Sequence, residues 1–195
     1  RQRVRATDSW RHDPETILDR TFKIGSAMTP SFAMTGGFNT RLTDNEIKAI
    51  FGTTTTASNH LVGELKSAAW AATDGDPKTS WKSADGIMDA TLNITADGGG
   101  DRITISTDES LSRVRQLLVQ VNDQKVRVPV DAGGVAVAAI PYKSGDVIQI
   151  TAVSTERRTV LDSRTGRRIR QGYGIKEVSG VGINPRSLNS LKLTC

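Results

Sequence analysis

The chain has 195 residues, a net charge of +5 and a sequence pI near 9.6. This length is enough for one sizeable hydrophobic core, or for one domain with an elaborated edge. Hydrophobic residues make up 36% of the chain and aromatic residues only 5%, so the core must consist of Val, Ile, Leu and Ala, a composition that favours strands. The longest apolar stretch, residues 133–141, is about half the length of a membrane-spanning helix, which excludes such a helix from this sequence.

Residues at the two ends of the sequence argue against an internal disulfide, a thiolate metal site and a signal peptide. The single cysteine, Cys195, cannot form an internal disulfide or a thiolate metal site. The polar, arginine-rich start does not resemble a signal peptide. We therefore expect a piece of a longer protein, with any membrane anchor or export signal outside these residues.

Residues 1–52 are the first predicted element. Asp13 before Pro14 and the capping box at residues 43–46 each predict the start of a short helix. Two short strands are predicted between them, over residues 21–25 and 31–38. The segment has too few apolar side chains for a core of its own. We expect it to be a lead-in element that packs against a main domain over residues 53–195.

From about residue 53 onward, apolar residues alternate with polar ones. Sets of side chains that share one strand face are Ile103 and Ile105; Leu117, Val119 and Val121; Val126, Val128 and Val130; Ile148, Ile150 and Ala152; and Tyr173 and Ile175. Turn residues separate these sets, at 98–100, 122–123, 133–134 and 144–146. Short strands at this spacing, without long helices between them, predict an all-β antiparallel sandwich and not a parallel α/β fold.

An arginine-rich stretch interrupts this pattern at residues 156–170. Six arginines stand against Glu156 and Asp162, which gives the stretch a charge of +4. Its alternation is poor and Gly166 marks a turn, so a protruding hairpin is predicted. The simplest interpretation is a solvated hairpin; the alternative is a surface that faces anionic lipid headgroups or the rest of the parent protein.

The segment with the most specific chemistry is the loop of residues 71–81, with the sequence AATDGDPKTSW. It places oxygen-bearing residues at short intervals, bends at a glycine and a proline, and ends on Trp81. Ca²⁺ takes six to eight oxygen ligands, many of them backbone carbonyls, and such a loop can supply several. Taken alone, the Asp-Gly-Asp-Pro sequence is equally typical of a simple turn.

This loop resembles the signature of the discoidin, or coagulation factor 5/8 type C, family, over about residues 57–185. The resemblance implies a jelly-roll β-sandwich, a buried Trp81 and a structural Ca²⁺ held by the loop and by a glutamate of a late strand. The implied calcium ligands are the carbonyls of Ala71, Asp76 and Lys176, the carboxylates of Asp74 and Glu177, and Thr79. The sequence departs from the family at residues 89–92, where the usual tryptophan is missing.

A second resemblance covers residues 19–22, 32–36, 158–162 and 174–178. These segments are similar to the soluble region of actinobacterial α-(1→3)-arabinofuranosyltransferases of the AftD type. The resemblance implies an extracytoplasmic module tethered to a membrane enzyme whose catalytic carboxylate lies in the membrane portion. The implied partners are the arabinan and galactan of the cell wall and the remainder of the parent enzyme.

A sugar site normally combines an aromatic ring with hydrogen-bonding side chains. Asn59, His60 and Trp70 precede the predicted calcium loop and are the candidates for such a site; Trp10 and Tyr142 are weaker ones. Trp70 fits a core position as well as a sugar platform, and the sequence leaves both open.

Other functions remain as alternatives. An enzyme would need a facing pair of carboxylates or a nucleophile motif, and the sequence offers no Gly-x-Ser-x-Gly or His-Glu-x-x-His. A nucleic-acid binder fits the basic charge, but aromatic residues do not alternate with the basic ones. A purely structural docking module without a ligand fits as well as a sugar-binding one.

Overall fold

The computed structural model describes residues 53–61, 65–162 and 165–182. The helices and strands predicted within residues 1–52 lie outside the described residues. All of the described residues fall within one compact unit that spans residues 38–195. Within the described ranges, no helix is long and apolar enough to cross a membrane.

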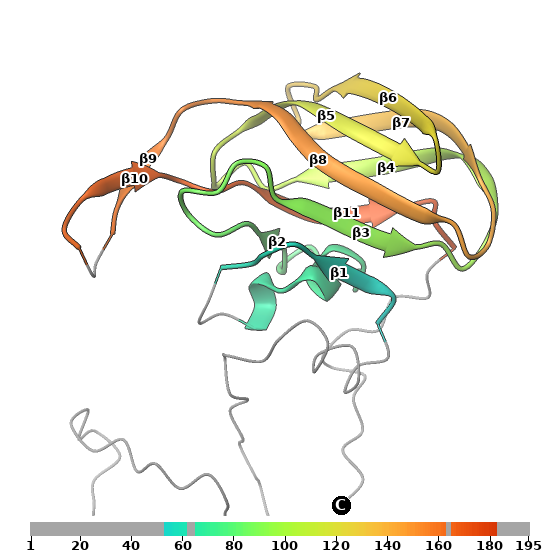
Figure 1. Cartoon of the computed structure of the whole chain (residues 1–195), viewed down its shortest axis with the longest axis horizontal. Helices are drawn as coiled ribbons and strands as arrows, with labels where there is room; N and C mark the ends of the chain where they lie inside the picture. The colour runs from blue at the N-terminus through green and yellow to red at the C-terminus, as the bar shows by residue number, and fades with distance from the viewer. Residues whose placement is uncertain (1–52, 62–64, 163–164, 183–195) are drawn as a thin grey trace, which may run out of the picture. The chain divides into compact units, whose positions relative to one another are not determined.

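The protein forms two antiparallel sheets that pack face to face (Figure 1). The five-stranded sheet contains, in spatial order, β1 (Thr55–Ala57), β3 (Thr91–Thr95), β8 (Val147–Thr155), β5 (Val114–Val121) and β6 (Gln124–Pro129). The four-stranded sheet contains β2 (Trp81–Lys82), β11 (Gly174–Ser179), β4 (Gly100–Thr107) and β7 (Val135–Tyr142). The prediction of an all-β antiparallel sandwich is confirmed.

The core lies between the inward faces of the two sheets. Ile103 and Ile105 of β4 are fully buried, as are Leu117 and Val119 of β5. Each of these pairs is spaced by two residues, because successive side chains of a strand point to opposite faces. The predicted inward faces of β4, β5 and β8 are therefore confirmed.

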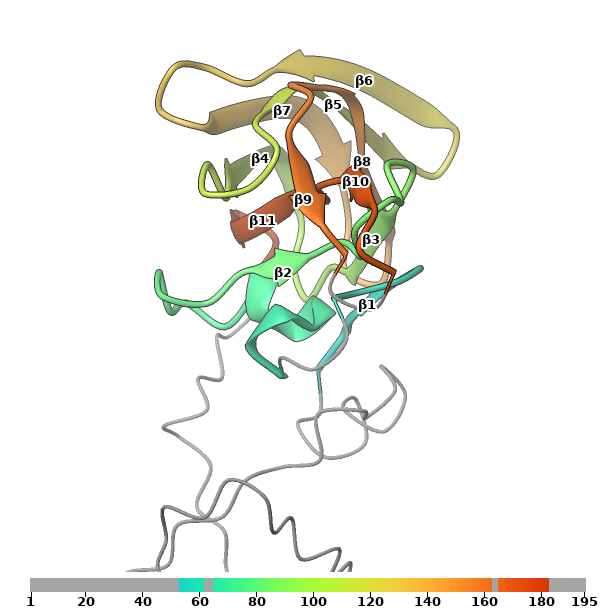
Figure 2. The same ribbon diagram turned by 90° about the vertical axis from the view of Figure 1, so that its left-hand side faces the viewer.

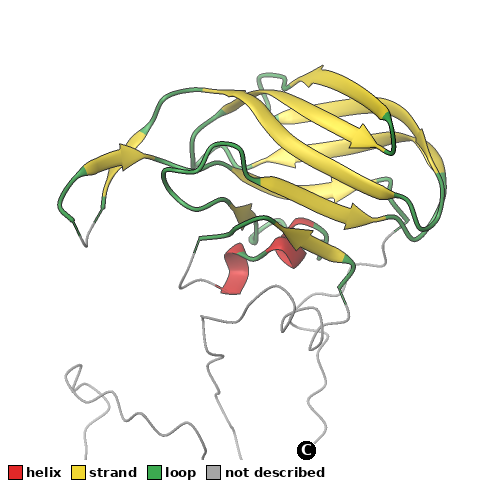
Figure 3. Cartoon of the chain, in the orientation of Figure 1, coloured by secondary structure: helices red, strands yellow, loops and turns green. Residues whose placement is uncertain are grey.

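Two short 3₁₀ helices lie beside β1 and β2 (Figure 3). They are η1 (Leu65–Ser67) and η2 (Ala69–Ala72), and all four residues of η2 are buried. Small alanine side chains allow the η2 backbone to approach the core closely. The carboxyl end of η2 leads directly into the loop of residues 73–80, so this packing fixes where the loop begins.

Trp81 and Tyr173 form the aromatic centre of the fold. Their rings meet edge to face, with centroids 5.4 Å apart and an interplanar angle of 89°. The Trp81 indole N–H donates to the carbonyl of Asn59 at 3.0 Å. The predicted burial of Trp81 is confirmed, since its side chain is fully enclosed.

The Tyr173 hydroxyl connects the two sheets. It donates to the carbonyl of Ala90 and accepts the amide N–H of Ala152 in β8 at 3.3 Å, although Tyr173 itself leads into β11. Burial raises the pKa of this phenol well above its usual value. The hydroxyl therefore stays protonated and keeps both hydrogen bonds at any pH at which the protein is studied.

The arginine-rich stretch is a hairpin, as predicted. Strands β9 (Thr159–Leu161) and β10 (Arg168–Arg170) pair with each other and stand apart from both sheets (Figures 1 and 2). Gly172 then brings the chain back into the fold. A Cβ atom at this position would lie 2.3 Å from the Ser83 carbonyl oxygen, so the two backbones cross too closely for any other residue.

Replacing Tyr173 with Phe should lower the free energy of unfolding by about 1 to 3 kcal/mol. The change leaves the buried Ala90 carbonyl and Ala152 amide without the partner that they share. Urea denaturation followed by tryptophan fluorescence measures the difference.

The matched control is Tyr142→Phe. Tyr142 is also mostly buried, but its hydroxyl makes no hydrogen bond to another described residue, so this variant should unfold close to the wild type. Equal losses in the two variants would show that the hydrogen bonds of Tyr173 do not hold the sheets together.

Candidate metal centre

The loop of residues 73–80 is folded by its own side chains. The Asp74 carboxylate accepts the amide N–H of Asp76 at 2.9 Å, and the Asp76 carboxylate accepts that of Lys78 at 3.0 Å. Such bonds to a residue two positions on are typical of aspartate in turns. Gly75, with φ of 71°, makes the sharp bend between the two aspartates. The sequence therefore encodes a tight loop that curls its oxygen atoms inward.

Four oxygen atoms meet in the centre of this loop. The Thr79 hydroxyl lies 2.9 Å from each carboxylate oxygen of Asp74 and 2.8 Å from the carbonyl oxygen of Asp76. A hydroxyl has one proton, so it can donate to only one of these three acceptors at a time. The Asp74 side chain is only 3% exposed. The amides of Asp76 and Thr79 donate to the Asp74 carboxylate and to the Asp76 carbonyl, so the loop closes by its own hydrogen bonds around a carboxylate that water reaches poorly.

Glu177 brings a second carboxylate to the loop from β11. Its Oε2 atom accepts the amide N–H of Gly75 at 3.1 Å, across a separation of 102 residues. The pairing of β11 with β4 shifts register between Ile175 and Glu177. A bulge of this kind re-aims side chains, and here it lies next to the residue whose carboxylate meets the loop.

Without a bound cation, the Asp74 and Glu177 carboxylates are both costly to ionise in the folded protein. Burial, followed by the nearby charge of Asp74, raises the pKa of Glu177 to about 7. Burial also raises the pKa of Asp74, against the opposing hydrogen bonds from Asp76 and Thr79. Within the described ranges neither carboxylate forms an ion pair with a basic side chain. A bound cation would reverse both shifts.

The type of metal follows from the donor set. No group of three or more His, Cys, Asp and Glu side chains lies close enough to hold a metal ion among the residues described. The oxygen atoms that the loop gathers belong to a carboxylate, a carbonyl and a hydroxyl group. This donor set suits Ca²⁺, a hard cation that accepts carbonyl ligands, and does not suit Zn²⁺.

The structure brings four of the six predicted metal ligands together, namely Asp74, Asp76, Thr79 and Glu177. The other two lie next to them in the chain. Ala71 is fully buried in η2, and Lys176 precedes Glu177 in β11. No hydrogen bond joins either of their carbonyl oxygens to the four-oxygen cluster.

Asp108 is a buried acid that the sequence did not single out. It accepts the Ser80 hydroxyl at 2.8 Å and the amide and hydroxyl of Ser110, and these bonds lower its pKa against the effect of burial. It thereby ties the end of the loop to the turn after β4. The Asp-x-Ser spacing of residues 108–110 is typical of such a turn and could have indicated it.

The residues predicted to bind a sugar are used differently. Trp70 is only 3% exposed, which fits the core position that the sequence left open better than an exposed sugar platform. The Asn59 side chain accepts the amide N–H of Ala84 at 3.0 Å, and its carbonyl accepts the Trp81 indole. Asn59 is thus engaged in holding the loop of residues 82–84. His60 is half-buried beside it.

A wider depression lies elsewhere, at the turns between β5 and β6 and between β7 and β8. Its volume is about 540 Å³, within the range of small-ligand sites. Tyr142 lines the depression, but it is only 5% exposed. The polar side chains that line it are Asn122, Asp123, Gln124, Lys143 and Asp146.

No protein-family model matches the chain, and no curated protein matches it. Among solved structures, the arabinofuranosyltransferase AftD from mycobacteria is similar at 23% identity with a TM-score of 0.48. That match covers 65% of this chain and 10% of the enzyme. The chain therefore spans about a tenth of the length of that protein.

Carbohydrate-binding modules are also among the similar structures. A chitosan-binding module of a chitosanase/glucanase from Paenibacillus sp. IK-5, in complex with chitotriose, is 17% identical with a TM-score of 0.47, over 67% of this chain and 96% of the module. The family 32 module of NanJ from C. perfringens, in complex with galactose, is 18% identical with a TM-score of 0.43, over 65% and 90%. At these identities and scores, no conclusion about the function of this chain follows. Both kinds of protein that the sequence motifs resemble are thus represented among the matches.

Proposed function

We propose that the chain is a non-catalytic β-sandwich module, stabilised by calcium, that binds carbohydrate. The observation that carries the calcium part is the four-oxygen cluster of Asp74, Asp76 and Thr79, with Glu177 beside it. Ca²⁺ at this point would neutralise the charge of the Asp74 and Glu177 carboxylates and join the loop to β11. Its role is structural, because it connects segments that are far apart in the sequence.

The same geometry argues against catalysis by the described residues. Glycoside hydrolysis needs two carboxylates that flank an open cleft, with room for a sugar ring between them. The Asp74 carboxylate is enclosed by its own loop, and the Gly75 amide binds the Glu177 carboxylate. Neither can reach a glycosidic bond while the loop is folded.

The sugar site that we propose is the depression beside Tyr142. A sugar presents apolar C–H groups and a rim of hydroxyls. The depression offers several side chains that donate or accept hydrogen bonds to such hydroxyls, and the largely buried Tyr142 at its wall. It is formed by two turns, so it lies at one end of the sandwich, where loops are positioned by a rigid scaffold.

The parent protein that we propose is a membrane arabinofuranosyltransferase of the actinobacterial cell wall, with this module on the extracytoplasmic side. The support for this step is the second sequence resemblance, in particular the segments of residues 158–162 and 174–178. Arabinan or galactan chains and the remainder of the enzyme are then the partners.

A docking module without a sugar ligand is the second candidate. It is favoured by the burial of Trp70 and by the hydrogen bond of the Asn59 side chain to the Ala84 amide, since both residues were among the three that the sequence offered for a sugar site. A calcium-stabilised loop would then shape a surface for the parent enzyme. Direct sugar titration separates the two candidates.

Removing calcium should lower the melting temperature. An ion at a hundred times its dissociation constant stabilises the native state by about 2.7 kcal/mol, which for a chain of this size corresponds to about 5 to 10 °C. Differential scanning fluorimetry with calcium and with a chelator measures this shift, and Asp74→Asn should abolish it.

The control for Asp74→Asn is Asp101→Asn, which removes an exposed carboxylate from β4. This variant should keep the full response to calcium. Superimposable melting curves of the wild type with calcium and with chelator would eliminate the calcium site.

In calcium-free protein, stability should fall as the pH rises from about 4.5 to about 7. The pKa of Glu177 is 4.5 in the unfolded chain and about 7 in the fold, so over this interval the unfolded state binds fewer protons than the native state. The stabilisation is complete below pH 4.5 and is lost as the pH passes through about 7. Urea denaturation in the presence of a chelator measures the slope.

Glu177→Gln is the control for this pH dependence, because an amide does not titrate. The variant should lack the fall in stability between these two pH values. A wild-type profile as flat as that of the variant would mean that Glu177 ionises in the fold without penalty.

Oligosaccharides of arabinan or galactan should bind with a dissociation constant of about 0.1 to 1 mM, which corresponds to a binding free energy of about 4 to 5.5 kcal/mol in favour of the complex. Water competes for every hydrogen bond at so open a site, which keeps the affinity low. Saturation-transfer NMR detects such binding. Gln124→Ala combined with Lys143→Ala should abolish it, whereas the neighbouring exposed Lys125→Ala should not.

His60→Ala tests the location that the sequence indicated. If this change abolishes binding and the pair at the depression does not, the sugar lies at residues 59–60 instead. Absence of saturation transfer in the wild type would leave the docking module as the function.

A further inference from the structure

The turn between β4 and β5, residues 108–113, is built around the carboxylate of Asp108. Its Oδ2 atom accepts the Ser80 hydroxyl at 2.8 Å. Its Oδ1 atom accepts the amide N–H and the hydroxyl of Ser110, at 3.0 and 2.6 Å. Asp108 is 7% exposed and Ser80 is 4% exposed. One buried carboxylate therefore joins the turn to the last residue of the loop of residues 73–80.

The same turn holds both ends of the β9–β10 hairpin. Just before β9, the Arg158 guanidinium donates to the carbonyl of Glu109 at 3.2 Å. Just after β10, the Gln171 carbonyl accepts the hydroxyl of Ser112, which is fully buried, at 2.7 Å. The Arg158 carbonyl also accepts the Gln171 amide N–H at 2.9 Å, so the two ends of the hairpin are closed on each other at the turn.

Side chains have a large part in the shape of this turn. Residues 108–113 belong to no helix or strand, so hydrogen bonds to neighbouring segments replace a regular ladder. Bonds within a buried polar network strengthen one another. A change in the position of Ser80 should therefore be felt through Asp108 at Arg158 and Gln171.

We propose that Asp108 is a positioning residue through which cation binding at the loop orders the β9–β10 hairpin. A cation on Asp74 and Thr79 would hold the neighbouring Ser80 in place. Ser80 then fixes Asp108, Asp108 fixes the turn, and the turn fixes both ends of the hairpin. Coupling between two sites is reciprocal, so the hairpin contacts also raise the affinity of the loop for calcium. This inference rests on the proposed calcium site and on neither a sugar ligand nor the parent enzyme.

The connection is tested first by hydrogen exchange of the 195-residue chain. Ser80→Ala removes the bond between the loop and the turn. With a chelator present, the paired amides of residues 159–161 and 168–170 should exchange roughly two- to tenfold faster than in the wild type. Saturating calcium should slow their exchange about fivefold or more in the wild type, and by a smaller factor in Ser80→Ala.

The matched control is Thr73→Val, at the opposite end of the same loop. It also removes a buried hydroxyl, one that bonds to the Thr55 hydroxyl at 2.8 Å and donates to the Trp70 carbonyl at 3.2 Å. The hairpin amides of this variant should exchange as in the wild type. Equal acceleration in both variants would mean that the hairpin responds to any loss of stability, and the proposal would be overturned.

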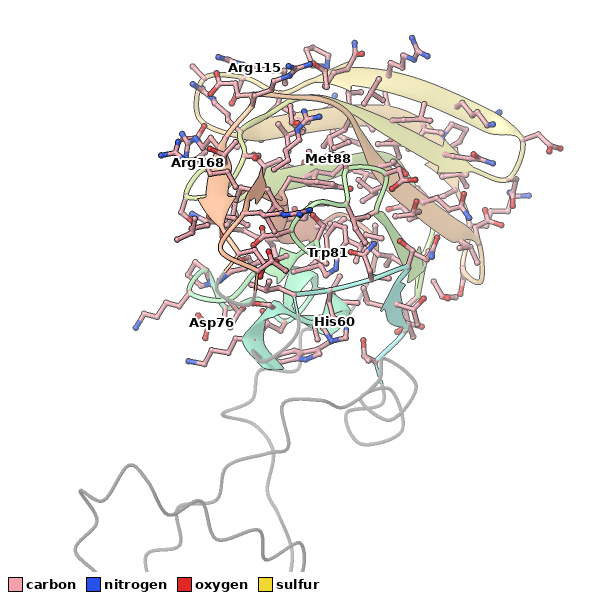
Figure 4. The ribbon with its side chains drawn as sticks, turned by 60° about the vertical axis from the view of Figure 1, so that its left-hand side comes forward. His60, Asp76, Trp81, Met88, Arg115 and Arg168 are labelled. Atoms are coloured by element: carbon pink, nitrogen blue, oxygen red, sulfur yellow. The ribbon has the colours of Figure 1, made fainter. Side chains whose placement is uncertain are left out.

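The reciprocal test is calcium titration calorimetry of Arg158→Gln, which breaks the bond between the turn and the hairpin. Loss of a positive charge alone should tighten the binding of a cation, whereas loss of the coupling should weaken it roughly two- to tenfold. The two explanations thus differ in sign. Arg168→Gln is the charge-matched control, since Arg168 is exposed and lies at the outer edge of the hairpin (Figure 4). This control should bind calcium at least as tightly as the wild type.

Calorimetry also separates this inference from the proposed function. Wild-type protein that takes up no calcium would overturn the calcium site and the coupling together. Calcium uptake by the wild type, with an affinity that Arg158→Gln leaves unchanged or raises, would overturn the coupling alone and leave the calcium site in place.

Discussion

Two carboxylates that meet at one loop, the buried Asp74 and the half-buried Glu177, are the constraint around which this end of the sandwich is organised. Asp74 and Glu177 reach their positions because η2 is packed into the core and β11 is bulged at the right residue. The low local dielectric makes their repulsion costly. It would also make a cation between them strongly bound, so the same feature that destabilises the metal-free loop would stabilise the occupied one.

The strand pattern and the turns were predictable because they depend on local chemistry. The inward sets at Ile103 and Ile105 and at Leu117 and Val119 follow from the two-residue period alone. The two 3₁₀ helices were not predicted. Residues 65–72 contain no helical apolar repeat, and Ala68 gives η2 no side-chain cap at its amino end; the four residues of η2 are instead buried against the core.

The candidate site was predictable in part for the same reason. The loop motif holds its ligands within nine residues, so sequence spacing is informative there, and Glu177 was found only through a family resemblance. The sugar residues could not be judged from the sequence, because the burial of Trp70 and the partners of Asn59 depend on tertiary contacts. Asp108 was missed for a related reason, since its partner Ser80 is 28 residues away.

Gly172 has a consequence for how related sequences would diverge. It stands between the arginine hairpin and Tyr173, at a backbone crossing where a methyl group would overlap the Ser83 carbonyl oxygen. On one side of it, side chains face solvent and substitutions cost little folding energy. On the other side, Tyr173 and Glu177 are fixed by both sheets and by the loop. In evolutionary terms, Gly172 marks a boundary at which the hairpin of β9 and β10 could be exchanged between homologues without altering the scaffold behind it.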